Sequence, residues 1–307
     1  YTIEIQAGED KVTGYFAMRT FTIEPDKKGL PRFCLNHEPL FLNGVLDQGY
    51  WPDGLYTAPS DEALIYDIQT MKNLGFNTLR KHIKVEPEEF YYHCDRLGMI
   101  VWQDMVNGGT YNAPFMTWLP ALFPKFKLHT SDRIHPLFGR KNVHGREEFI
   151  RECKETVTAL KAFPCISTWV IFNEGWGQFD SKKLTALFRE LDDTRLIDSA
   201  SGWQGDFKSE HNYFAKQFVT PSDRAFVISE YGGYTCQVKG HTCSGKTYGY
   251  KICSSQEEFQ AAYHKLMSEE IDPLKEQGLC GAVYTQLSDI EDEINGLITY
   301  DREVCKL

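Results

Sequence analysis

Residues 76–104 read FNTLRKHIKVEPEEFYYHCDRLGMIVWQD, and this stretch decides the fold class. An apolar strand pattern at Phe76–Arg80 is followed by a helix pattern that Pro87 opens and Gly98 closes. Met99–Gln103 is then a second apolar strand. Because both strands are apolar throughout, the pattern predicts parallel strands that helices cover on the outside.

The same order of strand and helix repeats from about residue 39 onward. We expect eight strands, the sixth of them weakly marked, at residues 40–45, 76–80, 99–103, 167–172, 195–198, 211–214, 225–228 and 280–284. Ser60 and Ser255 are the expected N-caps of two of the helices. Residues 39–307 have about the length, roughly 250 residues, that is typical of a (β/α)8 barrel. We therefore predict an α/β fold, a (β/α)8 TIM barrel over 39–307.

An open doubly wound sheet is the rival architecture. It usually carries a glycine-rich turn after its first strand, whereas residues 44–48 read GVLDQ. The helices expected after Gly202 and after Phe214 are poorly marked, which is the weakest part of the barrel prediction.

Residues 1–38 form a different kind of segment. Within it, residues 1–24 alternate in the manner of strands and end near Pro25 and Gly29. Two lone strands bury no core of their own, so we interpret this segment as the end of a β-sandwich domain or as a sheet packed on the barrel. The chain begins without methionine, and we expect it to be a piece of a longer protein whose sandwich domains precede the barrel.

Composition narrows the function. The net charge is −10 and no block of lysine or arginine occurs, which argues against a nucleic-acid or anionic-membrane partner. No apolar run approaches the roughly 20 residues of a membrane span. Nine cysteines without a C-x-x-C pair favour a reducing compartment such as the cytoplasm and argue against a zinc ribbon. Cys236, His241, Cys243 and Cys253 share one loop, but their spacing is too irregular for a typical metal site, and we expect no metal or other cofactor.

The chemistry of a barrel lies at the carboxyl ends of its strands. Glu174 and Glu230 each follow a run that is otherwise fully apolar, and burying a carboxylate there costs free energy unless it is paired or used. Two carboxylates in one cleft suit cleavage of a glycosidic bond, one as acid and one as nucleophile. The structural alternative is that each glutamate caps a helix or pairs with Arg80 or Lys81.

The motifs around these glutamates resemble a known family. Asn173-Glu174-Gly175-Trp176-Gly177 and Ser229-Glu230-Tyr231-Gly232-Gly233 resemble the catalytic barrel of glycoside hydrolase family 2, which holds β-galactosidases, β-glucuronidases and β-mannosidases. Further matching stretches are residues 14–19, 41–45, 77–82 and 95–104.

The resemblance implies a retaining exo-β-glycosidase acting on an oligosaccharide or glycoside. Glu174 would be the general acid/base and Glu230 the nucleophile. Asn173 would bind the sugar 2-hydroxyl, Arg80 would keep Glu230 ionised, and Tyr213 would donate to the same carboxylate. The remaining predicted contacts are Asp47, His82 and Asp104 with sugar hydroxyls, and Trp176, Trp203 and Tyr284 by stacking.

The identity of the sugar is a separate prediction. We take β-galactosidase as first choice, with β-glucuronidase or β-mannosidase as alternatives, although residues 46–54 lack the stretch that β-galactosidases usually carry there. Two other classes remain open: a non-catalytic carbohydrate-binding barrel, and a metal-dependent enzyme using His82, Asp104 and Asp198.

Overall fold

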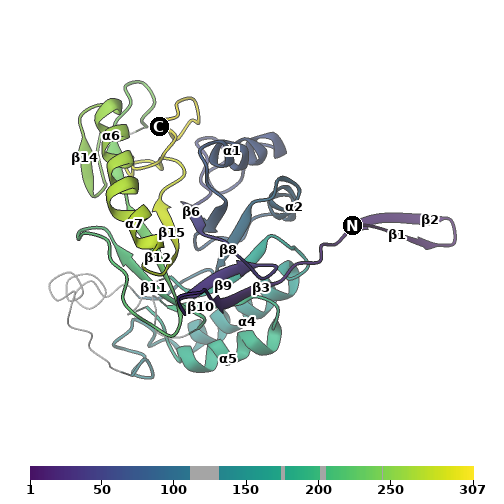
Figure 1. Cartoon of the computed structure of the whole chain (residues 1–307). Coiled ribbons are helices and arrows are strands. Elements are labelled where there is room, and N and C mark those ends of the chain that lie inside the picture. The colour runs from purple at the N-terminus through teal and green to yellow at the C-terminus, as the bar shows by residue number, and fades with distance from the viewer. Residues whose placement is uncertain (111–130, 174–176, 201–204, 244) are drawn as a thin grey trace.

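The computed structural model describes residues 1–110, 131–173, 177–200, 205–243 and 245–307 (Figure 1). Within these residues the largest sheet has eight strands, and its neighbouring strands are parallel. In chain order the strands are β6 (Leu42–Asp47), β7 (Thr78–Lys81), β8 (Ile100–Asp104), β9 (Ile166–Phe172), β10 (Leu196–Ala200), β11 (Phe207–Asn212), β12 (Ala225–Gly232) and β15 (Leu279–Thr285). The predicted TIM barrel is therefore confirmed.

The strand order β10-β9-β8-β7-β6-β15-β12-β11 nearly closes the sheet on itself. The last strand, β15, pairs with the first, β6, as a closed barrel requires. The two end strands, β10 and β11, are joined by a side-chain hydrogen bond in which Ser209 Oγ donates to Asp198 Oδ1 at 2.7 Å. All eight carboxyl ends consequently face the same rim.

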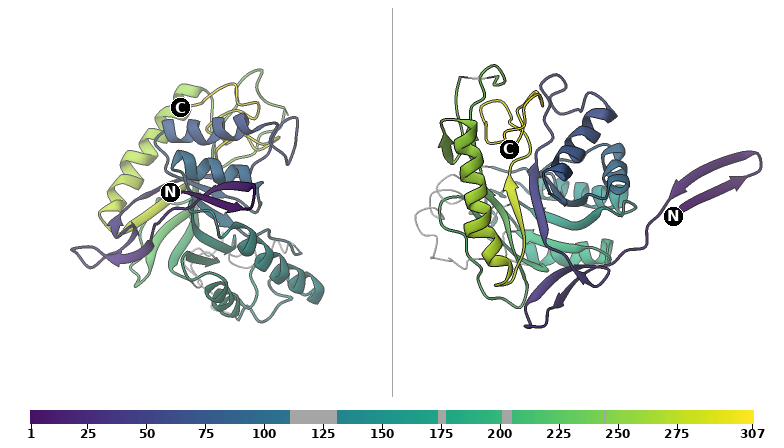
Figure 2. Two further views of the ribbon diagram at one scale, coloured as in Figure 1. Left: turned by 90° about the vertical axis from the view of Figure 1, so that its right-hand side faces the viewer. Right: turned by 45° about the horizontal axis from the view of Figure 1, so that its top comes forward.

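Helices cover the outer face of the sheet (Figure 2). Ser60 accepts a hydrogen bond from the backbone of Ala63 and Ser255 from that of Glu258, as their predicted capping roles require. Gly98 ends its helix at a φ of +71°, a conformation that glycine adopts without strain. The helices are α1 (Asp61–Asn73), α2 (Glu88–Leu97), α4 (Val143–Leu160), α5 (Ser181–Leu191) and α6 (Gln256–Leu266), the last continued by a π-helical turn, η2 (Met267–Ile271), and by α7 (Asp272–Lys275).

The prediction and the structure differ on the side of β11. The sixth strand begins at Phe207, earlier than the expected 211–214, and residues 213–224 contain no helix. Helix α5 was not predicted, although Leu184 and Phe188 bury one of its faces. A short parallel pair, β13 (Tyr234–Cys236) with β14 (Lys251–Cys253), lies in the loop between β12 and α6.

The N-terminal residues form two separate sheets. The hairpin of β1 (Thr2–Ala7) and β2 (Asp10–Tyr15) projects away from the barrel (Figures 1 and 2). The antiparallel sheet of β3 (Phe21–Pro25), β4 (Pro31–Leu35) and β5 (Glu38–Pro39) instead shares a buried apolar cluster with the barrel strands. Residues 21–39 thus pack on the barrel, and the predicted domain boundary after residue 38 stays a prediction.

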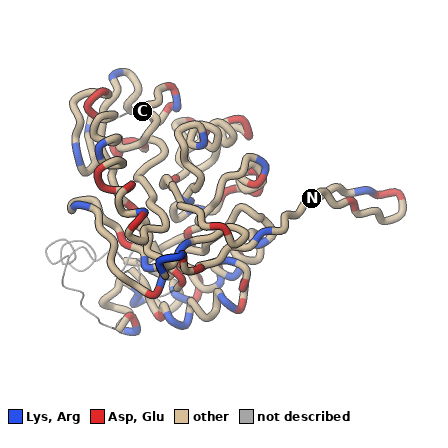
Figure 3. The backbone as a smooth tube through the Cα atoms, viewed as in Figure 1, with Lys and Arg blue, Asp and Glu red and all other residues tan. Residues whose placement is uncertain are grey.

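Charged residues of both signs are interspersed along the chain (Figure 3). Among the described helices, none combines the length and the apolar character that crossing a membrane would need.

Replacing Phe33 with alanine should destabilise the fold by about 3–5 kcal/mol, because a fully buried ring leaves a cavity. Phe33 is 0% exposed and lies 5.7 Å from the ring of Phe21 and 6.5 Å from that of Phe207. Denaturant unfolding measures the loss. As a matched control, Phe214 is 81% exposed, and its replacement with alanine should change stability by less than about 0.5 kcal/mol. Equal losses in the two variants would contradict the buried role of the N-terminal sheet.

Candidate active site

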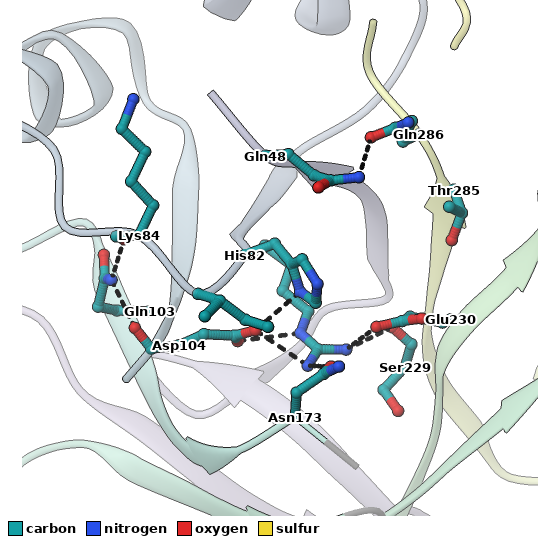
Figure 4. A network of polar contacts seen from close by, with 12 residues as sticks. Gln48, His82, Lys84, Gln103, Asp104, Asn173, Ser229, Glu230, Thr285 and Gln286 are labelled. Carbon is teal, nitrogen blue, oxygen red and sulfur yellow. Dashed lines mark hydrogen bonds and ion pairs between the residues drawn. The ribbon is translucent and has the colours of Figure 1, made fainter. Parts of the chain in front are cut away.

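The side chain of Arg80 on β7 bonds to residues on or directly after three other strands. Figure 4 shows three of these partners, Asp104, Asn173 and Glu230, within one network of polar contacts. Arg80 Nε and Nη2 donate to the two oxygens of Asp104 on β8, at 3.0 and 3.1 Å. Nη2 also donates to Asn173 Oδ1, directly after β9, at 2.7 Å. Nη1 donates to Glu230 Oε1 at 3.1 Å and to the carbonyl of Ser229 at 3.0 Å, both on β12. The guanidinium therefore fixes the relative positions of these side chains.

The charges of this network stabilise each other despite their burial. Burial alone would lower the pKa of Arg80, but the nearby charges of Asp104 and Glu230 outweigh it and raise that pKa above its ordinary value. Burial alone would likewise raise the pKa of Asp104, but Arg80 and His82 bring it below its ordinary value of 3.8. Arg80 and Asp104 are accordingly a charged pair at neutral pH.

The carboxylate of Glu230 has contacts on both oxygens. Opposite Arg80, the hydroxyl of Tyr213 donates to Glu230 Oε2 at 2.6 Å. His211 Nδ1 lies 3.4 Å from the same oxygen. Glu230 is 5% exposed, so these contacts replace most of its water. Such an arrangement holds the carboxylate in one orientation.

Tyr213 is itself held in place by its neighbours. Its ring stacks on Tyr250 with centroids 3.8 Å apart and planes 9° apart, and its hydroxyl lies 2.8 Å from Thr285 Oγ1. Burial and the charge of Glu230 raise the pKa of Tyr213 well above its ordinary value. The phenol therefore keeps its proton and acts as a donor.

Asp47 and Asp104 have different surroundings from those predicted. Asp47 Oδ2 pairs with Lys81 at 2.6 Å and Oδ1 accepts from the backbone of Gly49 at 2.9 Å. Asp104 is fully buried with both oxygens toward Arg80, and His82 Nδ1 lies 3.1 Å from its Oδ2. These contacts give Asp47 and Asp104 a role in positioning Lys81 and Arg80, and their predicted contacts with sugar hydroxyls stay predictions.

Tyr284 does not line the site either. It is 0% exposed, its ring packs edge-on against those of Tyr231 and Tyr263, and its hydroxyl accepts from the backbone of Tyr234. A ring enclosed in this way is part of the packing between β15 and α6 and offers no face to a sugar. The predicted stacking role of Tyr284 is therefore wrong.

Three predicted residues, Glu174, Trp176 and Trp203, lie outside the described residues. Asn173 directly precedes them, and since its oxygen accepts from Arg80, a bond to a sugar hydroxyl would use its Nδ2. His82 is partly exposed beside Asp104 and stays a candidate for substrate contact.

Sequence reasoning missed several side chains of the rim. His211 contacts Glu230, and Thr285 contacts Tyr213. Gln48 Nε2 donates to Gln286 Oε1 at 2.9 Å and to Glu293 Oε2 at 3.2 Å. Gln48, Thr285 and Gln286 lie at the ends of β6 and β15, so the rule that selected Glu230 would also have selected them.

The cysteine-containing loop forms no site among the described residues. Cys236 and Cys253 are paired in register between β13 and β14 and are buried, whereas Cys243 is exposed. No group of three or more metal-binding side chains occurs in the part of the chain that the structure describes.

Comparison with known proteins identifies the family. Residues 28–305 match the family described as glycosyl hydrolases family 2, TIM barrel domain. A Formosa agariphila protein provisionally named as a β-glucuronidase is 25% identical over 199 residues, which are 63% of this chain and 16% of that protein. An exo-β-D-glucosaminidase from Amycolatopsis orientalis is 27% identical over 124 residues, 38% of this chain and 11% of that enzyme.

The solved structures agree on the fold. A β-D-glucuronidase structure from Dictyoglomus thermophilum superposes with a TM-score of 0.69 at 15% identity, covering 99% of this chain and 55% of that one. The chain thus spans about half of this structure and less than a fifth of the curated relatives. The predicted preference for β-galactosides is not supported by the names of these relatives.

A third carboxyl group, Asp198, lies between Ser209 and the charges of the network. It is 2% exposed, and burial raises its pKa to about 6 although Ser209 and Arg80 oppose the shift. Between its ordinary pKa of 3.8 and about 6, the folded chain binds more protons at this site than the unfolded chain. Its contribution to stability is therefore complete below pH 3.8 and is lost as the pH rises through 6.

Replacing Asp198 with asparagine should make stability depend less on pH. Between pH 4 and pH 7, the fall in the free energy of unfolding should shrink by about 2–3 kcal/mol, since one strongly shifted group no longer titrates. Urea unfolding at a series of pH values measures this slope. Burial also raises the pKa of Asp67 and of Asp289 to about 6, so these two groups retain part of the pH dependence in the variant. Replacing the exposed Asp223 with asparagine is the control, and an unchanged slope in the Asp198 variant would count against its burial as a neutral acid.

Proposed function

Because the chain belongs to glycoside hydrolase family 2, we propose that it is the catalytic barrel of a retaining exo-β-glycosidase with Glu230 as nucleophile. One observation carries the proposal: a nearly buried carboxylate at the rim accepts from Arg80 on one oxygen and from Tyr213 on the other. A purely structural ion pair has no need of a second donor fixed by its own aromatic stack.

In the first step Glu230 attacks the anomeric carbon and the bond to the leaving oxygen breaks. Glu174 gives its proton to that oxygen, and a covalent glycosyl-enzyme results. Arg80 holds Oε1 of Glu230 by a charged hydrogen bond at 3.1 Å. Tyr213 holds one oxygen by a hydrogen bond, so the carboxylate has little freedom to rotate.

In the second step water replaces Glu230 at the anomeric carbon. Glu174, now a carboxylate, takes a proton from that water, and Glu230 leaves as a carboxylate that Arg80 and Tyr213 again stabilise. Two inversions at one carbon give net retention. In this proposal the amide of Asn173, whose oxygen accepts from Arg80, binds the hydroxyl next to the anomeric carbon.

Replacing Glu230 with glutamine should lower kcat/KM on an aryl β-glycoside by more than about 10³-fold, because a neutral amide does not displace the leaving group. Azide should restore turnover of the Glu230→Ala variant and yield a glycosyl azide. Proton NMR of the first product reads retention directly. Replacing the exposed Glu190 with glutamine is the control and should leave the rate unchanged. Activity of the Glu230→Gln variant equal to that of the unaltered chain would refute the assignment.

For the sugar we propose a β-glucuronide in place of the β-galactoside expected from the motifs. The support is the name of the Formosa agariphila relative, which matches the larger share of this chain. The exo-β-D-glucosaminidase is a second relative at similar identity, and a β-glucosaminide is therefore the alternative.

A panel of aryl β-glycosides carrying glucuronate, galactose, mannose, glucose and glucosamine decides between these sugars. We expect kcat/KM on the glucuronide to exceed that on the galactoside by at least about tenfold, which corresponds to about 1.4 kcal/mol of transition-state binding. A higher value on the galactoside or on the glucosaminide would overturn the preference. The Glu230→Gln variant, assayed on each sugar, shows that the turnover belongs to this site.

A further inference from the structure

A pocket opens near the rim of the barrel, between the connection that follows β8 and the first turns of α4. Its volume is about 450 Å³. It lies at the carboxyl ends of the strands, as Glu230 does, but on the side of the strands that carry Asp104 and Asn173. The residues of its lining that matter here are Asn107, Gly109, Arg140, Asn142, Gly145 and Arg146.

Arg140 is a buried cation in this pocket with neutral partners. It is 7% exposed, its Nε donates to the carbonyl of Gly177 at 2.6 Å, and its Nη2 donates to Asn107 Oδ1. No carboxylate pairs with it among the described residues. Burial lowers its pKa to about 10, so it keeps its charge at neutral pH. A buried charge without a counter-charge is costly, and it is rare unless a ligand completes it.

Aromatic rings compensate this charge only in part. The guanidinium lies 5.5 Å from the ring centre of Phe149, 5.8 Å from that of Phe172 and 5.7 Å from that of Phe179. Such cation–π contacts contribute about 0.5–2 kcal/mol each and leave the net charge in place. They hold the flat guanidinium in one orientation.

Nη1 is the part of Arg140 that remains for a ligand, since no hydrogen-bond partner meets it in the described structure. Gly109 lies directly beside it, at a φ of +137°, and a Cβ there would come within 3.1 Å of Nη1. Glycine at this position therefore keeps the nitrogen uncovered.

The first turn of α4 adds a second positive feature. The helix is 18 residues long, its first turn contains no acidic residue, and its N-cap, Asn142, lines the pocket. The N-terminus of a helix offers backbone N–H groups and a partial positive charge to an anion. Arg146, also in the lining, donates to the carbonyls of Arg140 and Lys141.

The pocket also has an acidic side, which limits the size of the anion. Glu148 and Glu152 line it further along α4, and Glu148 is paired with Arg151. The positive groups gather at the opposite end, around Arg140 and the start of the helix. A single oxyanion fits there better than an extended polyanion.

We propose that this pocket binds one oxyanion group, a carboxylate or a sulfate ester, on a part of the substrate other than the sugar that reacts at Glu230. The inference rests on the proposed glycosidase function and deepens it: the substrate is an acidic oligosaccharide or a glycoside with an acidic aglycone. Nη1 of Arg140 provides the donor, and the partial positive charge at the start of α4 adds to the attraction, while the N–H of Gly145 donates to Asn142 Oδ1.

Gly145 gives a clean test because it lies in the first turn of α4 and lines the pocket without touching Arg140. The nearest atom to a Cβ there would be Asn142 Cγ at 3.7 Å, an ordinary contact. Gly145→Asp places a competing carboxylate beside the helix N-terminus, a position that favours an acidic side chain and preserves the fold. Gly145→Asn has the same shape without the charge and is the matched control.

Calorimetry with inorganic sulfate and with acetate, at an ionic strength fixed by chloride, measures the site directly. We expect the unaltered chain and Gly145→Asn to bind one of these anions with equal affinity within about twofold, and Gly145→Asp to bind it at least about tenfold more weakly. Preference for sulfate assigns a sulfate ester, and preference for acetate assigns a carboxylate. No saturable binding above the chloride background, or equal binding by Gly145→Asp, would overturn the proposal and leave Arg140 as a link between loops.

The same variants separate this proposal from the proposed function. On an aryl β-glycoside with an uncharged aglycone, all three proteins should have the same kcat/KM. On a second aryl β-glycoside, whose aglycone carries a sulfonate, kcat/KM should be lower for Gly145→Asp than for the unaltered chain and for Gly145→Asn. Anion binding without hydrolysis of either substrate would refute the proposed glycosidase function and support the anion site. Hydrolysis without anion binding would support the glycosidase function and refute the anion site.

Discussion

The guanidinium of Arg80 is the interaction on which the rest of the site depends. It is almost completely buried and binds Asp104, Asn173 and Glu230, which come from three different strands. Each of these groups would be costly to bury alone. Because one planar cation satisfies all three, the barrel can hold polar side chains at its centre in one arrangement.

The next residue, Lys81, holds two carboxylates on the outer side of the barrel, as Arg80 does on the inner side. Successive side chains of a strand point to opposite faces, so Lys81 lies away from Arg80 and over the ring of Phe90 on α2, at 4.6 Å. It pairs with Asp47 and Glu86, and burial would lower its pKa if those carboxylates did not raise it above the ordinary value. Two consecutive cations of β7 thus fix the interior of the site and the loop that begins at Asp47.

The sequence was sufficient to predict the barrel and the position of Glu230 near the end of a strand, because apolar strands and the polar residues that end them are local features. It was insufficient where a shift of one residue in the strand register decides which way a side chain points. Tyr284 faces outward, whereas its neighbour Thr285 meets Tyr213, and alternation along β15 is fixed only when the strand is paired. His211 reaches Glu230 because the register of β11 shifts between Glu210 and His211, and a bulge of this kind leaves no signal in composition or periodicity. The pairing of Asp47 with Lys81 likewise depends on the contact between β6 and β7.

The balance of charge in the site has a consequence for the proposed reaction. Arg80 faces two carboxylates, Asp104 and Glu230, so the described part of the network carries an excess of negative charge. Burial raises the pKa of the nearby Asp198, whereas the charge of Arg80 opposes that shift. A transition state with oxocarbenium character develops positive charge at the anomeric carbon. Negative charge that is fixed before the reaction stabilises this transition state more than the neutral substrate, which is what catalysis requires. The network that makes the site costly to bury is therefore also the source of its proposed selectivity for the transition state.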